Sequence, residues 1–230
     1  FAAFYAIVSA VNARHEAAAI AIYVAMVLDG MDGRIARMTN TQSAFGAEYD
    51  SLSDMIAFRL APALTIYLWA LESMGKLGWL AAFIYTAAAA LRLARFNTQV
   101  ASADKRYFQG LPSPAAAAVL AGMVWVGASG DYVTAGIVTL VAFVATLALA
   151  LLMVSNVRYH SFKNLDLRGR VPFATVLAMG AVLVFISLDP SLVLCSGFVL
   201  YAIWGPVGTV RDLRRRRLAR RHGAGPSGPP

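Results

Sequence analysis

Long apolar blocks dominate this chain, and their length is the feature that most constrains its fold. Most blocks run on for several helical turns with few charged side chains between their ends. A helix of about 20 apolar residues matches the hydrocarbon thickness of a bilayer. Inside that layer every backbone polar group needs an internal partner, which a helix supplies. We therefore expect an all-α, polytopic membrane protein built as a helical bundle.

The amino-acid composition excludes an ordinary soluble domain. Hydrophobic residues make up 59% of the 230 positions and charged residues only 14%, with a mean hydropathy of +0.63. A soluble domain of this length needs a larger charged fraction to cover its surface. We expect one membrane domain over residues 1–210 and a basic cytoplasmic tail over residues 211–230. The tail is expected to be disordered, because it is rich in arginine, glycine and proline.

The apolar blocks predict about eight membrane spans, the first of them truncated. Residues 1–11 are too short to cross a bilayer, and we expect them to be the later part of a helix that begins before the chain does. The other seven spans are predicted over residues 17–38, 47–71, 77–96, 114–128, 133–154, 171–188 and 191–210. Alanine runs at residues 87–90 and 115–118 are typical of close helix packing in lipid.

The distribution of lysine and arginine predicts the orientation of these spans. One side receives segments 39–45, 97–111 and 155–170 and the tail, and the last three of these carry nearly all the lysine and arginine of the connecting segments. The segments on the other side carry only Arg14 and Lys76. Because positive charge is enriched in cytoplasmic loops, we expect the first side to be cytoplasmic. The formal net charge of +8 is concentrated in the tail, which we expect to face anionic lipid headgroups rather than nucleic acid.

Four aspartates lie within or at the cytoplasmic ends of the second and third predicted spans. They are Asp29, Asp32, Asp50 and Asp54. A carboxylate at that depth is costly unless it is paired, ligates a metal or faces water. Pairing with Arg34, Arg37 or Arg59 does not easily account for all four, whereas a divalent cation would. Oxygen ligands without cysteine or histidine favour one or two magnesium or manganese ions over zinc, and magnesium commonly binds substrate phosphates as well.

Residues with little or no side chain border both aspartate pairs. The two aspartates of each pair are three or four positions apart and share one face of a helix. The same faces continue at Gly33, Ala36 and Gly46. Small residues beside carboxylates let a bulky ligand or a second backbone come close. The pattern therefore predicts a site for a metal ion together with a phosphate ester or anhydride.

The whole pattern reads Asp29-x2-Asp32-Gly33-x2-Ala36-Arg37-x8-Gly46-x3-Asp50-x3-Asp54. It resembles the signature of the CDP-alcohol phosphatidyltransferases at each fixed position, which is far more specific than a lone glycine motif. The resemblance implies a membrane-embedded site, open to the cytoplasm, that binds a CDP-linked lipid and a divalent cation. It also implies transfer of the phosphatidyl group to an alcohol with release of CMP, a homodimer, and a bacterial plasma membrane location.

The resemblance also implies a role for each signature residue. Asp54 is expected to act as general base on the acceptor hydroxyl, besides being a candidate metal ligand. The metal ligands are expected to be Asp29, Asp32, Asp50 and Asp54. The residues expected to contact the nucleotide part of the CDP-lipid are Asp29, Gly33, Ala36, Arg37, Gly46 and Asp50.

Three further stretches resemble the phosphatidylserine synthases of this family, and they indicate serine as the acceptor. They are Leu-Arg-Leu-Ala-Arg-Phe-Asn at residues 91–97, Phe-Gln-Gly-Leu-Pro-Ser-Pro at 108–114 and Ser-Asn-Val-Arg-Tyr at 155–159. These stretches are less sharply defined than the aspartate signature.

Basic residues near these stretches are candidates for binding the acceptor. The serine carboxylate suits the fork of Arg92 or Arg95, with Asn97 close by. Either arginine could instead reach lipid phosphates from the end of its span. Lys105 and Arg106 are candidates for lipid or acceptor phosphate contacts, and an ordinary solvated loop explains them equally well.

Two other functions fit parts of the sequence. The same chemistry with glycerol 3-phosphate or an inositol derivative as acceptor would call for a denser basic pocket near the third to fifth spans. A membrane transporter also carries intramembrane carboxylates. Transporters, however, often repeat interrupted helices in two halves, whereas the aspartates here are concentrated in one early hairpin.

Overall fold

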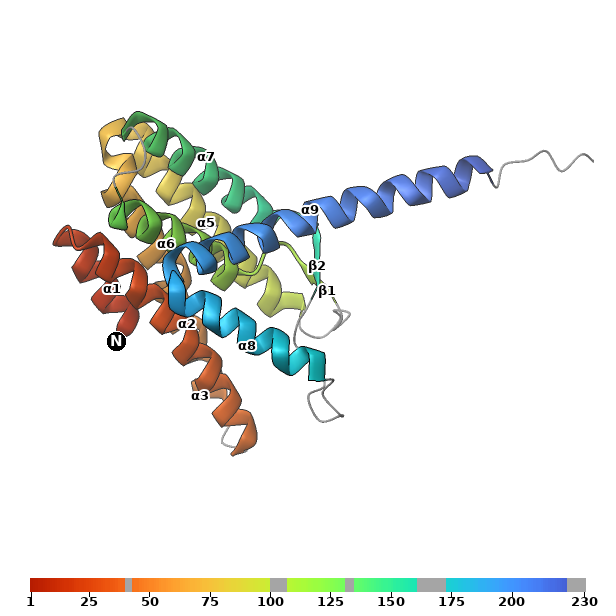
Figure 1. The fold of residues 1–230 in the computed structure, drawn as a ribbon, viewed down its shortest axis with the longest axis horizontal. Coiled ribbons are helices and arrows are strands. Elements are labelled where there is room, and N and C mark those ends of the chain that lie inside the picture. The colour runs from red at the N-terminus through yellow and green to blue at the C-terminus, as the bar shows by residue number, and fades with distance from the viewer. Residues whose placement is uncertain (40–42, 100–106, 131–134, 161–172, 223–230) are drawn as a thin grey trace, which may run out of the picture.

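The computed structural model describes residues 1–39, 43–99, 107–130, 135–160 and 173–222, and this part of the chain is a bundle of helices (Figure 1). The all-α membrane fold expected from the sequence is confirmed, with one short two-stranded ribbon added to it. The principal helices are α1 (Ala2–Val11), α2 (His15–Met38), α3 (Ala44–Met55), α4 (Ala61–Ile66), α5 (Lys76–Gln99), α6 (Ser113–Ser129), α7 (Ala135–Val154), α8 (Phe173–Leu188) and α9 (Pro190–His222).

Each predicted span forms a helix, and the predicted ends lie within three residues of the observed ones except at the end of α9. The third span is one continuous helical run in which α3 and α4 are joined by a π-helical segment, η1 (Ile56–Leu60). A second π-helical segment, η2 (Tyr67–Leu71), and a 3₁₀ turn, η3 (Glu72–Met74), complete that run. Neither π-helical segment was expected from the sequence.

Helix α9 extends well beyond the bundle (Figure 1). It continues as helix through residues 211–222, where the sequence predicted disorder. Arginine and leucine are good helix formers, and no glycine or proline intervenes before Gly223. The division of the chain at residue 210 stays a prediction.

In the described part of the chain, four helical stretches are long and apolar enough to cross a membrane, judged by length and composition. They are Ala44–Met74, Lys76–Arg95, Gly136–Val154 and Pro190–Thr209. Helix α2 is not among them, because charged side chains interrupt its apolar run. The surface of α7 shows what these stretches present outward, since Leu140, Val144 and Leu151 are all exposed. Extensive apolar exposure of this kind is stable only against lipid, so the chain is an integral membrane protein.

The core is centred on α6, whose first three turns are buried almost completely. Ala115, Ala116, Ala117 and Ala118 all lie inside, as the alanine runs predicted. Because these side chains are so small, neighbouring helices approach the α6 backbone closely. The hydroxyl of Tyr23 on α2 donates a hydrogen bond of 2.7 Å to the carbonyl of Ala118.

A short ribbon joins the loop before α6 to the loop after α7. Strand β1 (Tyr107–Gln109) pairs antiparallel with β2 (Arg158–His160). At its end Gly110 adopts φ +77°, and a Cβ there would lie 2.3 Å from the carbonyl oxygen of Met153. Only glycine fits at this position. The hydroxyl of Tyr159 donates to the carbonyl of Ala202 at 2.9 Å, which fastens the ribbon to α9 (Figure 1).

A substitution at Gly122 on α6 would test how closely α2 and α9 approach this helix. A Cβ at this position would lie 2.7 Å from the Tyr23 hydroxyl and 2.8 Å from Cys195 Cβ. Gly122→Ala should therefore lower stability by about 1–3 kcal/mol through overpacking. Thermal unfolding of the detergent-purified protein measures this change. Gly136→Ala is the control, because a Cβ there meets nothing within 4 Å. Equal melting temperatures for the two variants would contradict this packing.

Candidate functional site

A cavity of about 640 Å³ opens between α2 and α3, with the start of α1 along its side. Its wall contains six of the eight signature residues, namely Asp29, Asp32, Gly33, Ala36, Gly46 and Asp50. Residues from two separate spans are thus gathered around one space. The glycines and the alanine leave that space open, as the sequence predicted.

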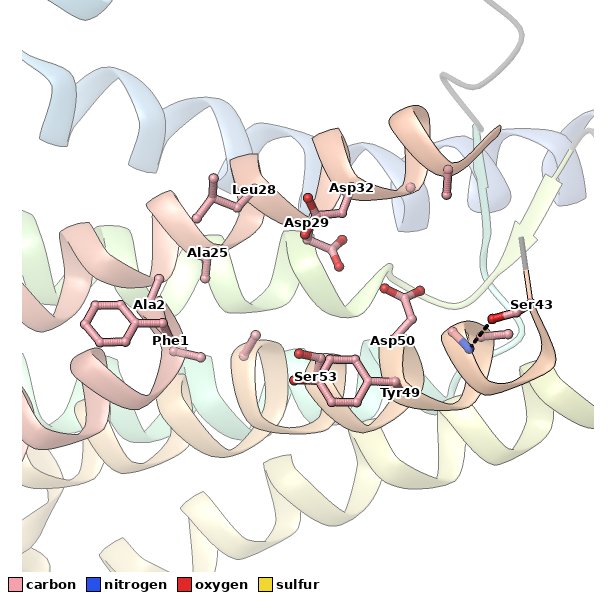
Figure 2. A pocket seen from close by; sticks show the side chains of 16 residues that line it. Phe1, Ala2, Ala25, Leu28, Asp29, Asp32, Ser43, Tyr49, Asp50 and Ser53 are labelled. Atoms are coloured by element: carbon pink, nitrogen blue, oxygen red, sulfur yellow. Dashed lines mark hydrogen bonds between the residues drawn. The ribbon is translucent and has the colours of Figure 1, made fainter. Parts of the chain in front are cut away.

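Carboxylates approach the cavity from both helices. Asp29 on α2 and Asp50 on α3 point into the space between the helices (Figure 2). The start of α3 is fixed by Ser43, whose hydroxyl accepts a hydrogen bond of 3.0 Å from the backbone N–H of Gly46. This is an N-cap, which satisfies a donor that has no partner within the helix. The cap sets where α3 begins and therefore which of its residues line the cavity.

Asp54 does not line the cavity, but its carboxyl lies close to one of the aspartates that do. Its carboxyl is within hydrogen-bonding reach of the Asp29 carboxyl. Two carboxylates in contact repel unless a proton or a cation lies between them. Asp50 also acts electrostatically on both, and the Oδ1 atom of Asp54 is buried without a hydrogen-bond partner. The arrangement leaves a buried acceptor oxygen available to a ligand.

The residues present fit a divalent cation in their chemistry. All the donors are carboxylate oxygens, they face or adjoin one cavity, and one of those oxygens is buried and unsatisfied. Oxygen donors of this kind suit magnesium or manganese. Across the described ranges, however, no three acidic, histidine or cysteine side chains are close enough together to form a ready-made ligand set. The metal-ligand assignment therefore stays a prediction.

The basic candidates on α5 lie beside the other two sequence motifs. The Arg92 Nη1 atom is 3.5 Å from the hydroxyl of Ser113, which belongs to the stretch at 108–114. The Arg95 Nη2 atom donates a hydrogen bond of 2.8 Å to Oδ1 of Asn156, in the stretch at 155–159. The three stretches far apart in the sequence thus meet at one end of the bundle.

Some predicted site residues cannot be placed in full. Arg37 lies on α2 and Asn97 on α5, but their side chains are outside the described part of the structure. Lys105 and Arg106 lie outside the described residues altogether. Their proposed contacts with phosphates or with the acceptor stay predictions.

Arg59 is a charged residue near the site whose importance the sequence did not reveal. It lies in η1 and is only 2% exposed, yet the sequence suggested it only as a counter-ion for an aspartate. It acts electrostatically on both Asp54 and Arg92. The available signal was an arginine in an otherwise apolar stretch five residues after Asp54.

Comparisons with known proteins agree with this geometry. The chain matches the family described as CDP-alcohol phosphatidyltransferase over residues 1–149. It is 35% identical over 185 residues to a protein of Helicobacter pylori named CDP-diacylglycerol–serine O-phosphatidyltransferase, covering 80% of this chain and 76% of that protein. A protein of the same name from Methanocaldococcus jannaschii is 33% identical over 191 residues, covering 83% of each chain. A Mycobacterium bovis protein of that name is 40% identical over 125 residues, covering 52% of this chain and 43% of that protein.

The cavity carboxylates give a direct test of cation binding. Asp29→Asn and Asp50→Asn should each weaken Mn²⁺ binding about tenfold or more, because each replaces a charged oxygen donor by a neutral one. Manganese titration of the purified protein, followed by electron paramagnetic resonance, measures the affinity. Glu48→Gln is the matched control, since Glu48 is on α3 but does not line the cavity. Unchanged affinity in both aspartate variants would contradict the ligand assignment.

Proposed function

The chain belongs to the CDP-alcohol phosphatidyltransferase family, and we propose that it transfers the phosphatidyl group of CDP-diacylglycerol to the hydroxyl of L-serine. The products are phosphatidylserine and CMP. The observation that carries this proposal is the gathering of six signature residues around one cavity. The named relatives support serine as the acceptor, because two of them align with four-fifths or more of this chain.

The cavity is proposed to hold the nucleotide end of the CDP-lipid. Gly33, Ala36 and Gly46 leave room for the cytidine part, and the neighbouring aspartates face the diphosphate side. Arg37 is proposed to contact the nucleotide phosphates, because a guanidinium pairs well with phosphate oxygens. A cavity open at the protein surface suits a ligand whose lipid tails remain in the bilayer.

Asp29, Asp32 and Asp50, with Asp54 beside them, are the residues proposed to hold one or two magnesium or manganese ions. Such an ion supplies Lewis-acid chemistry and neutralises the charge that develops on the departing phosphate. Without a cation the carboxylates would repel the diphosphate that the cavity has to bind. The aspartates therefore serve binding and charge balance together.

Asp54 is proposed to be the general base. The serine hydroxyl gives its proton to the Asp54 carboxylate while its oxygen forms a bond to the lipid-linked phosphorus. The bond from that phosphorus to the oxygen of CMP breaks, and CMP leaves with the electron pair. The Oδ1 atom of Asp54 is buried without a partner, so it has a lone pair free to accept this proton.

The orientation, location and assembly are also proposals. The basic segments support a site on the cytoplasmic face, because positive charge is enriched in cytoplasmic loops. The bacterial plasma membrane and a homodimer are proposed from the family resemblance. A site open to the cytoplasm could take up soluble serine and release CMP directly into the cytoplasm.

The acceptor can be identified by one assay. Purified protein is incubated with CDP-diacylglycerol, Mn²⁺ and one alcohol at a time, and CMP release is measured. Serine should support release at least tenfold faster than glycerol 3-phosphate or inositol. Faster release with either of those alcohols would reassign the acceptor within the same chemistry. No release with any acceptor would favour the transporter alternative.

Asp54→Asn tests the general base. The variant keeps the shape of the side chain but not its ability to take up a proton. We expect turnover to fall by about 10²- to 10⁴-fold, the range typical of a lost general base. Binding of CDP-diacylglycerol, measured by calorimetry, should remain detectable. Glu72→Gln serves as the control, because Glu72 is an exposed carboxylate in η3. Wild-type turnover in Asp54→Asn would exclude this role.

A further inference from the structure

Three charged side chains, Asp54, Arg59 and Arg92, each have one buried polar atom without a hydrogen-bond partner. The described part of the chain has five buried side-chain polar atoms of this kind, and three belong to charged residues. They are Oδ1 of Asp54, Nη1 of Arg59 and Nε of Arg92. Arg59 is within electrostatic range of each of the other two side chains. A buried polar atom without a partner is costly, and three together point to a missing ligand.

Arg59 is held in place by the packing of η1 against α5. It is the largest fully buried side chain in the described part of the chain. Its Nε atom donates a hydrogen bond of 3.1 Å to the carbonyl of Ala89 on α5. The hydroxyl of Tyr85, also on α5, donates to the carbonyl of Phe58 at 3.2 Å. These two bonds fix the Arg59 guanidinium, so its free Nη1 atom has a defined position.

Arg59 and Arg92 are two positive charges on neighbouring elements, η1 and α5. Two guanidinium groups within electrostatic range of each other repel, so an anion between them would relieve that repulsion. Asp54 is near Arg59, but its carboxyl is within hydrogen-bonding reach of Asp29 and its Oδ1 atom stays unpaired. The opposite charges are therefore close but not satisfied by each other. A ligand with an anionic group at one end and a hydroxyl at the other would satisfy both.

We propose that Arg59, together with Arg92, binds the carboxylate of the serine acceptor and makes the site selective for a carboxylated alcohol. This inference rests on the proposed function and assigns Arg59 a role that the signature does not include. Serine carries its carboxylate and its hydroxyl on neighbouring carbons, so one molecule reaches the guanidinium groups and Asp54 together. Arg95 is less suited, because it is already hydrogen-bonded to Asn156.

The π-helical form of η1 is consistent with a ligand-binding role. A π-helical turn accommodates an extra residue and is frequent at functional sites. Here the segment follows α3 directly, and both of its hydrogen bonds to α5 involve neighbouring residues, Phe58 and Arg59. The element that carries the proposed base is thus continuous with the element that carries the proposed carboxylate ligand.

The test compares serine with serine methyl ester, which keeps the hydroxyl and the ammonium but has no carboxylate charge. Wild-type protein should prefer serine in kcat/KM by about 10- to 100-fold, the value of a charge-assisted hydrogen bond. Arg59→Gln should raise the KM for serine by a similar factor and remove most of that preference. The KM for CDP-diacylglycerol should stay within about twofold, since Arg59 is outside the nucleotide cavity.

Two further variants keep this test decisive. Arg59→Lys retains the charge in the buried site but lacks the fork, so its preference for serine should be intermediate. If Arg59→Gln does not fold, the preference of Arg59→Lys for serine over the methyl ester is the result that decides. Arg14→Gln is the control, because Arg14 is an exposed arginine that lies over the ring of Tyr5. It should leave both acceptors unaffected.

The outcomes separate this inference from the proposed function. If wild-type protein uses serine but the Arg59 variants keep the full preference over the methyl ester, the role of Arg59 is overturned and the proposed function stands. Equal losses for both acceptors would likewise overturn it, since they indicate a structural role alone. If wild-type protein releases CMP only with another alcohol, both proposals fail.

Discussion

The closeness of like charges at the open edge of an apolar bundle is the constraint on which the rest of this structure depends. Asp29 and Asp54 are within hydrogen-bonding reach of each other, and Asp50 adds its charge to theirs. In a medium of low dielectric constant such repulsion is screened far less than in water. A chain with only 14% charged residues keeps these groups together, so something must balance them. The cation and diphosphate proposed for the cavity would provide that balance, which a purely structural role would not.

The bundle has a tightly packed part around α6 and an open part around the cavity. Helix α6 is buried through most of its length, and Tyr23 fastens α2 to it. Asp29 and Asp32 lie in the later half of α2 and Asp50 lies in the middle of α3, where the cavity opens. Burial on one half of α2 thus holds the carboxylates on the other half in position. A rigid frame with an open edge suits a site that has to admit a lipid substrate and release a soluble product.

Sequence reasoning recovered the helices because bilayer thickness imposes a length that apolar blocks reveal directly. It also placed six signature residues around one space, because helical spacing fixes which side chains share a face. It did not find η1 or the β1–β2 ribbon, since both depend on contacts between distant segments. Arg59 was underestimated for the same reason. Its burial depends on α5, which follows it by many residues, and hydropathy shows nothing of its bond to Ala89.

The order of groups in space matches the order of groups in the proposed reaction. Asp29 lines the cavity proposed for the nucleotide, its carboxyl is in reach of Asp54, and Asp54 lies within electrostatic range of Arg59. A phosphorus bound between the diphosphate site and the base would meet the acceptor hydroxyl from the side of the arginines. Positioning both substrates in this way supplies much of the catalytic effect in a transfer between bound groups. In this proposal the arginines would matter for alignment as well as for affinity, because the acceptor hydroxyl would face Asp54 only when its other end is held.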